Sequence, residues 1–160
     1  MARVTPASEG GQAIIELALT LPLLLLVVLG VFDFGLMFQR YEVVTNAARE
    51  GARLAVLKDQ YTPAQARQRA LDYLAAGGVT GTVRTGDCTS GTTAGTICVY
   101  VPDTPSSVPL TGTSPVINVT ETFCRVEYDH QFAFVGPIMS LFGGSLGTTP
   151  LRAASWMRVE

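Results

Sequence analysis

The stretch LALTLPLLLLVVLGVF, residues 17–32, decides how this chain is organised. Its only polar side chain is Thr20, and it carries no charge. As a helix at ~1.5 Å per residue it covers about 24 Å, a little short of the ~30 Å hydrocarbon core of a bilayer. Extension over residues 13–38 gives roughly 39 Å and places Glu16 and Asp33 near the two ends. The run therefore predicts a single transmembrane helix, which we assign to residues 12–38.

Two other interpretations of the apolar run fit its surroundings less well. A buried core helix would not need such uniform apolarity. A cleaved secretory signal needs a basic start and a small-x-small site after the apolar stretch. Here the leader holds both Arg3 and Glu9, and DFGLMF (residues 33–38) follows the run.

The composition of the whole chain agrees with an anchored protein. Of the 160 residues only 15% are charged, against about 25% in typical soluble domains, and the apolar excess lies in the first third. The formal net charge of −2 gives no indication of a nucleic-acid partner. The three cysteines form no CxxC pair, so neither a zinc ribbon nor a thioredoxin-type site is expected.

Glu16 is the residue of the first third that most needs an explanation. A carboxylate at the edge of an apolar segment is costly and is often functional, although it can also extend to the lipid headgroups. Residues 1–11 form a short polar leader, and a cut between Gly11 and Gln12 would make Glu16 the fifth residue of the mature chain. Its carboxylate could then neutralise the new α-amino group of a neighbouring subunit within lipid.

These motifs resemble those of the TadE-like minor pilins (pseudopilins) of the Tad pilus system. GQAIIE (residues 11–16) is similar to the cleavage pattern of prepilin peptidase substrates, and residues 10–35 look like the family's signature. TNAAREGARLAVL (residues 45–57) resembles the segment that follows, and residues 151–160 resemble its C-terminal strand. Leu17 departs from the family pattern, which usually has an aromatic residue after the glutamate.

The resemblance implies a minor pilin that acts in pilus assembly, secretion or adhesion, and it implies a set of partners. It implies processing at Gly11, Gln12 and Glu16, and assembly through Glu16. The implied partners are a prepilin peptidase, other Tad pilins and minor pilins, an inner-membrane assembly platform and the lipid bilayer. The implied location is the cytoplasmic (inner) membrane, with one membrane pass and the C-terminal domain outside the cytoplasm. The alternative is a single-pass membrane-anchored binding module unrelated to pili.

Two features of the long helix have both a functional and an ordinary explanation. Pro22 predicts a kink, either as an assembly device or as an ordinary membrane proline. Beyond the membrane the helix is expected to continue through residues 39–58. There Ala47, Gly51 and Ala55 form a stripe of small residues that permits close helix approach, to the protein's own domain or to another subunit.

Residues 59–160 are expected to form an exported domain, so that the fold class is α+β: a long helix followed by a small antiparallel sheet domain, pilin-like in outline. Thr62 and Pro63 start a helix that Gly77 and Gly78 end. The predicted strands cover residues 79–85, 96–101, 117–132 and 151–159, with Gly, Ser, Thr and Pro loops between them. The apolar segment 136–150 is expected either to pack as a short helix under the sheet or to form an exposed patch for a partner.

The cysteines allow two pairings. Cys88 and Cys98 flank a nine-residue loop, and a disulfide between them would be worth roughly 2–3 kcal/mol. Cys98 with Cys124, across adjacent strands, is the alternative, and either pairing leaves one cysteine unpaired.

No catalytic, cofactor or metal site is predicted. His130 is the only histidine, and it lies in a β-rich stretch with no nucleophile motif near it. GxSxG, HExxH and P-loop patterns do not occur in the sequence. An anchored enzyme would need polar side chains that converge on His130.

Overall fold

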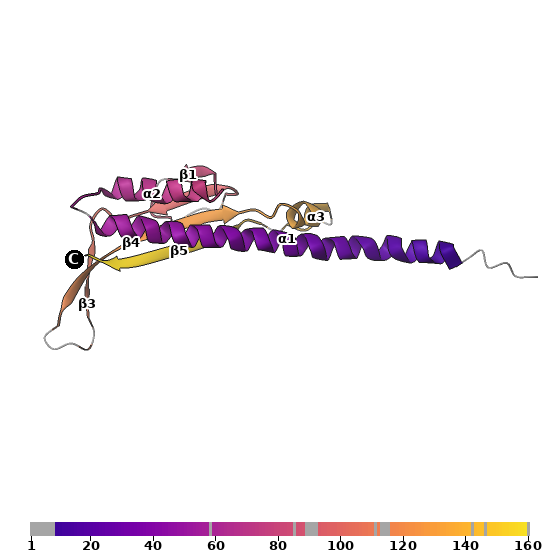
Figure 1. The fold of residues 1–160 in the computed structure, drawn as a ribbon, viewed down its shortest axis with the longest axis horizontal. Coiled ribbons are helices and arrows are strands. Elements are labelled where there is room, and N and C mark those ends of the chain that lie inside the picture. The colour runs from indigo at the N-terminus through magenta and orange to yellow at the C-terminus, as the bar shows by residue number, and fades with distance from the viewer. Residues whose placement is uncertain are drawn as a thin grey trace, which may run out of the picture.

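The described part of the chain folds into three helices and five strands (Figure 1). The computed structural model describes residues 9–57, 59–84, 86–88, 93–110, 112, 116–141, 143–145 and 147–159. The elements are α1 (Glu9–Val56), α2 (Pro63–Ala76), β1 (Thr82–Arg84), β2 (Thr96–Tyr100), β3 (Ser106–Pro109), β4 (Asn118–His130), α3 (Val135–Leu141) and β5 (Thr149–Arg158). Residues 1–8 of the expected leader lie outside the described residues.

The long helix α1 is 48 residues in one piece, or about 72 Å at ~1.5 Å per residue. Its C-terminal half lies along the sheet, and its N-terminal part extends past α3, beyond every other element (Figure 1). We call the remaining helices and strands, α2, α3 and β1 to β5, the head. The predicted class, a long apolar helix followed by a small α+β domain, is confirmed.

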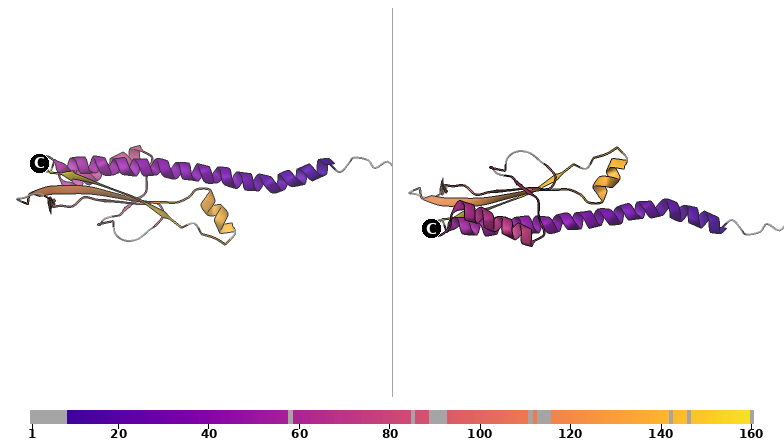
Figure 2. Two further views of the ribbon diagram at one scale, coloured as in Figure 1. Left: turned by 90° about the horizontal axis from the view of Figure 1, so that it is seen from below. Right: turned by 90° about the horizontal axis from the view of Figure 1, so that it is seen from above.

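The central strand β4 organises the sheet. One edge of its 13 residues pairs with two strands in succession, β2 along residues 125–128 and β3 along residues 118–121. Its other edge pairs with β5 over residues 121–130, and all three pairings are antiparallel. Both α1 and α2 cover one face of this sheet (Figure 2).

One strand pair corrects the expectation of an antiparallel sheet. β1 pairs with β2 in parallel, with Thr82 opposite Thr96 and Arg84 opposite Cys98, so the sheet is mixed. The physical reason lies at the point where the chain re-enters the sheet, because Asp129 of β4 binds the residues directly before β2. Its backbone carbonyl accepts from Gly95 N at 2.9 Å, and its carboxylate accepts from Thr93 N at 3.2 Å.

The core forms where α1 packs against both α2 and the sheet. Val44, Ala47, Ala48 and Ala52 of α1 are fully or almost fully buried there. The other side of the core comes from α2, β2, β4 and β5 (Ala66, Ala70, Leu74, Ile97, Val99, Cys124, Val126, Tyr128 and Leu151).

Gly51 belongs to the small-residue stripe, and it is buried within this core. A Cβ at this position would lie 2.5 Å from Cys124 Sγ and 3.2 Å from Ala70 Cβ. The stripe therefore packs against the protein's own head, the first of the two alternatives given above.

The capping signals of α2 act as predicted. Thr62 Oγ1 accepts from Gln65 N at 3.3 Å, and Gln65 Oε1 accepts from Thr62 N at 2.8 Å, which is a capping box. At the other end Gly77 N donates to Tyr73 O at 3.0 Å, and Gly78 has a φ of +75° that favours glycine.

Two elements differ from the expectations. The loop that was expected between residues 102 and 115 contains β3, an exposed edge strand that the central strand recruits through backbone pairing. Of the two alternatives given for the segment 136–150, packing under the sheet is wrong for α3, which has no buried residue. α3 lies beside α1 instead, at the end of the head nearest the N-terminal part of α1 (Figures 1 and 2).

Candidate functional site

The most distinctive surface of the molecule is the N-terminal part of α1, residues 11–38, which we call the apolar half. Every residue from Gly11 to Val28 is exposed, including Leu19 at 80% and Leu23 at 71%. By length and composition α1 can cross a membrane, and none of its most apolar 18-residue window is buried in the protein. A core helix would be covered on at least one side. A helix that is apolar all round and uncovered is suited to lipid on every side, which is compatible with single-pass anchoring.

The residues expected to be processed lie at the start of this helix. α1 begins at Glu9, so Gly11 and Gln12 are in its first turn. A Cβ at Gly11 would meet nothing within 4 Å, so the surroundings of the Gly11–Gln12 bond, where the cut is expected, are open. Glycine also lowers the stability of a helix locally, by about 1 kcal/mol relative to alanine, which makes this first turn easier to unwind.

Glu16 is exposed one helical turn beyond Gln12. Within the described residues its carboxylate has no hydrogen-bond or ion-pair partner, while its backbone carbonyl accepts from Thr20 Oγ1 at 2.9 Å. The single hydroxyl of the apolar run is thus satisfied inside the helix, whereas the Glu16 carboxylate is unpaired within the described residues.

Pro22 lies inside α1 without ending it. Because proline has no N–H, the carbonyl four residues before it loses its helical partner, and such helices bend. Figure 2 shows a bend in the apolar half of α1, the half that contains Pro22.

Asp33 has a role that the sequence did not indicate. Its carboxylate is 1% exposed and accepts three backbone N–H groups, from Ala133 at 3.1 Å, Phe134 at 2.9 Å and Val135 at 2.7 Å. It therefore attaches the turn before α3, and the start of α3, to the apolar half of α1. The available signal was an acid in a long apolar run, but its partners lie 100 to 102 residues away.

His130 contributes to a contact with α1. Arg40 Nη1 lies 2.9 Å from His130 Nδ1 and donates to Tyr128 Oη at 3.3 Å. Burial, and next the positive charge of Arg40, lower the pKa of His130, while Asp33 acts in the opposite direction. The ring is therefore neutral at pH 7, with Nδ1 as the acceptor, and the pair joins α1 to β4 just beyond the apolar half.

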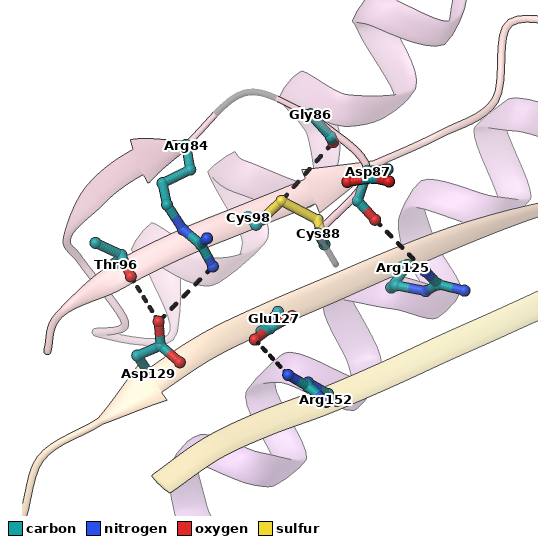
Figure 3. Close-up of a disulfide and its surroundings, with 10 residues drawn as sticks. All are labelled: Arg84, Gly86, Asp87, Cys88, Thr96, Cys98, Arg125, Glu127, Asp129 and Arg152. Atoms are coloured by element: carbon teal, nitrogen blue, oxygen red, sulfur yellow. Dashed lines mark hydrogen bonds and ion pairs between the residues drawn. A yellow bond between two sulfur atoms is a disulfide. The ribbon is translucent and has the colours of Figure 1, made fainter. Parts of the chain in front are cut away.

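The face of the sheet opposite α1 carries a disulfide (Figure 3). Cys88 and Cys98 are joined by a disulfide, with their Cα atoms 5.6 Å apart. Cys124 is free and buried against α1, and burial raises the pKa of its thiol to about 12. Since Cys98 and Cys124 point to opposite faces of the sheet, the alternative pairing is not formed.

Two charged pairs lie on this outer face of the sheet. Asp129 is fully buried and accepts from Thr96 Oγ1 at 2.7 Å, with Arg84 at 3.7 Å. Glu127 pairs with Arg152 at 3.1 Å (Figure 3). No group of three or more metal-ligating side chains occurs among the described residues.

Fold and site together define a class: a protein in which one membrane-capable helix, the one found among the described residues, continues without a break into a small α+β head. The family model described as "TadE-like protein" matches residues 11–53, which span the apolar half of α1 and the part that enters the core. Over this stretch the chain is similar to the TadE-like family, as its motifs indicated. Searches of curated proteins and of solved structures gave no match to this chain.

Proposed function

We propose that the chain is a minor pilin or pseudopilin of a Tad-type pilus that acts in pilus assembly and has no catalytic role. The observation that carries the proposal is the division of α1 into an uncovered apolar half, with Glu16 near its start, and a half that is built into the head. A prepilin peptidase would cut between Gly11 and Gln12, on the cytoplasmic side of the inner membrane. The mature helix would then hold the subunit in the bilayer before assembly.

The spacing of Glu16 supports this assignment. After the cut its carboxylate would lie four residues from the new α-amino group of Gln12, about 6 Å along the helix axis. Within one helix this separation leaves both charges incompletely compensated in lipid, where an unpaired charge is expensive. Two subunits packed side by side with a small axial offset would each satisfy the other's charge.

A second candidate function, an anchored binding module, is favoured by one observation. The outer face of the sheet exposes Trp156 at 54%, stacked on Phe123 with ring centroids 4.2 Å apart. Exposed aromatic side chains of this kind are common at recognition surfaces. The two candidates differ at the N-terminus, because only the pilin requires processing.

We expect the protein extracted from membranes to begin at Gln12 when an active prepilin peptidase is present. Intact-mass measurement in cells with and without the peptidase checks this. Gly11→Leu should block the cut by placing a bulky side chain at the cleaved bond, whereas Gly10→Ala, the matched control, should be processed normally. An N-terminus at Met1 or Ala2 in the presence of the peptidase would contradict the proposal.

Glu16→Ala should leave insertion and cleavage largely intact but reduce copurification with the major pilin or other minor pilins. We expect a loss of roughly tenfold, equivalent to ~1.4 kcal/mol, because the amino group of a neighbour would lose its counter-charge in lipid. Glu42→Ala, which removes an exposed carboxylate on the same helix beyond the apolar half, is the matched control. Unchanged assembly of the Glu16 variant would mean that this carboxylate only extends to the lipid headgroups and does not pair with a neighbouring subunit.

The proposed topology places the N-terminus in the cytoplasm and the head outside it. Counting positive charges gives the opposite answer, since the leader offers one arginine and the region after the apolar run is basic (Arg40, Arg49, Arg53 and Lys58). That rule applies best to short loops, and long domains translocate largely regardless of charge. The disulfide is typical of an oxidising compartment, which favours export.

A membrane-impermeant maleimide tests the topology in intact spheroplasts. We expect labelling of Cys88 or Cys98 from outside only after reduction. Cys124 should stay silent because it is buried and its thiol pKa is about 12, so Cys124→Ala should not change the result. Labelling that needs no reductant and appears only after the membrane is broken would contradict both the topology and the disulfide.

A further inference from the structure

We propose that α3 and the turn before it form a second lipid contact, which sits in the outer leaflet of the bilayer beside α1. We call residues 132–141 the α3 unit. The inference rests on the proposed membrane anchoring of α1 and extends it, because it gives the head its own membrane-binding surface and fixes the depth at which the head sits.

The first observation is the absence of charge. Residues 131–151, QFAFVGPIMSLFGGSLGTTPL, carry no charged side chain. Most of the apolar side chains of the α3 unit nevertheless lie outside the core. α3 has no buried residue, and Leu141 is 83% exposed, with Phe134 at 39% and Met139 at 37%. In water such a surface would be unfavourable by about 25 cal/mol per Å² of apolar area.

The second observation is that this surface continues the apolar surface of α1. Phe134 packs edge-on against Phe32, and Phe132 packs edge-on against Phe34, each with ring centroids 5.8 Å apart. Val135 closes a groove of about 640 Å³. The other walls of the groove come from α1 (Leu26, Val27, Gly30, Val31, Phe34, Gly35 and Phe38). The α3 unit thus lies at the same depth as residues 26–38, which are expected to be within the membrane.

The third observation is that the polar groups of the unit are compensated from within. The backbone N–H groups before α3 and the carboxylate of Asp33 would each be costly in lipid, but they bind one another, and Asp33 is 1% exposed. Ser140 Oγ donates to Pro137 O at 2.6 Å, so its hydroxyl is also satisfied locally. The outward surface of the unit is therefore mainly apolar.

Lipid explains this surface better than a protein partner does. Specific protein interfaces combine an apolar centre with polar groups that fix the orientation of the partner. The α3 unit has no such charged rim, and it adjoins a helix that is exposed and apolar all round. The first cation after the apolar run, Arg40, lies seven residues beyond Asp33, about 10 Å along the helix. This places the membrane surface between Asp33 and Arg40.

The test uses the full chain in phosphatidylcholine vesicles, with and without brominated acyl chains that quench tryptophan. The background variant is Trp156→Phe, and one tryptophan is then introduced at a time. Leu141→Trp reports on the α3 unit, Val27→Trp on the anchor, and Tyr61→Trp on the far end of the head, where the side chain is 39% exposed. Met139→Trp is a second probe of α3.

We expect Leu141→Trp and Met139→Trp to lose most of their emission to brominated lipid, as Val27→Trp does, while Tyr61→Trp keeps its emission. Quenching of Val27→Trp without quenching of either α3 probe would overturn this inference and leave the anchor intact. If the α3 probes escape quenching because they are shielded in a dimer that can be cross-linked, the surface contacts a second copy of the chain. That result would also overturn the inference. No quenching of Val27→Trp would overturn the proposed anchoring itself.

Discussion

Asp33→Ala is expected to detach α3 from α1 while the sheet stays folded. The variant removes the acceptor of three buried N–H groups, of Ala133, Phe134 and Val135, and each unsatisfied group costs about 1–3 kcal/mol. The segment escapes this cost by opening, because α3 has no buried residues of its own to hold it. We expect amide exchange at these three positions to accelerate at least a hundredfold, equivalent to ~2.7 kcal/mol.

Hydrogen–deuterium exchange of the full chain in detergent micelles measures this effect. Asp33→Asn should be intermediate, because its one carbonyl oxygen can accept from only part of the set. Glu42→Ala, an exposed acid on the same helix, should not change the exchange at all. Amides of β4 such as Val126 should keep their protection in every variant. Equal protection of the three amides in Asp33→Ala and in the unmodified chain would show that the carboxylate does not hold α3.

Gly51→Val is expected to separate α1 from the head. Even a Cβ at this position would lie 2.5 Å from Cys124 Sγ and 3.2 Å from Ala70 Cβ, so neither the sheet nor α2 has room for it. Overpacking a rigid core costs about 1–3 kcal/mol, and valine adds two further methyl groups to the clash. We expect the free energy of unfolding of the head to fall by more than about 3 kcal/mol, measured by urea titration with Trp156 fluorescence.

Matched variants separate packing from helix propensity. Gly35→Val lies on the same helix, where a Cβ meets nothing within 4 Å, and it should leave the head as stable as before. Gly51→Ala should be milder than valine, since alanine also gains about 1 kcal/mol of helix propensity. Adding Cys124→Ala to Gly51→Ala removes the Sγ atom and should restore part of the loss. A Gly51→Val protein as stable as the Gly35→Val protein would contradict the packing argument.

Several parts of this molecule follow from short-range patterns. Residues 17–32 are apolar in every direction around a helix, and no partner within the chain is needed to predict a membrane-capable segment. The ends of α2 are also local, because Thr62, Pro63 and Gly77 act on backbone groups within one turn. The family match over residues 11–53 covers the membrane-capable segment but not α2.

The sheet could be predicted only in part. The β-rich stretches located β2, β4 and β5 because alternating and β-branched residues mark half-buried strands. They did not give the direction of β1 or the existence of β3. The pairing direction of β1 depends on where the chain re-enters the sheet, and here Asp129 binds the residues directly before β2. β3 forms because one edge of β4 is free to pair with it along residues 118–121.

The sequence by itself determined that the chain has one lipid-suited helix with an acid near its start, and that an α+β domain follows. Only the tertiary structure decided that Asp33 holds α3 beside that helix, that Arg40 contacts His130, and that Gly51 of the small-residue stripe packs on Cys124. The physical reason is the range of the interactions. Apolarity and capping act within a few residues, whereas these contacts join groups that are brought together only after α1 has packed on β4 and α2.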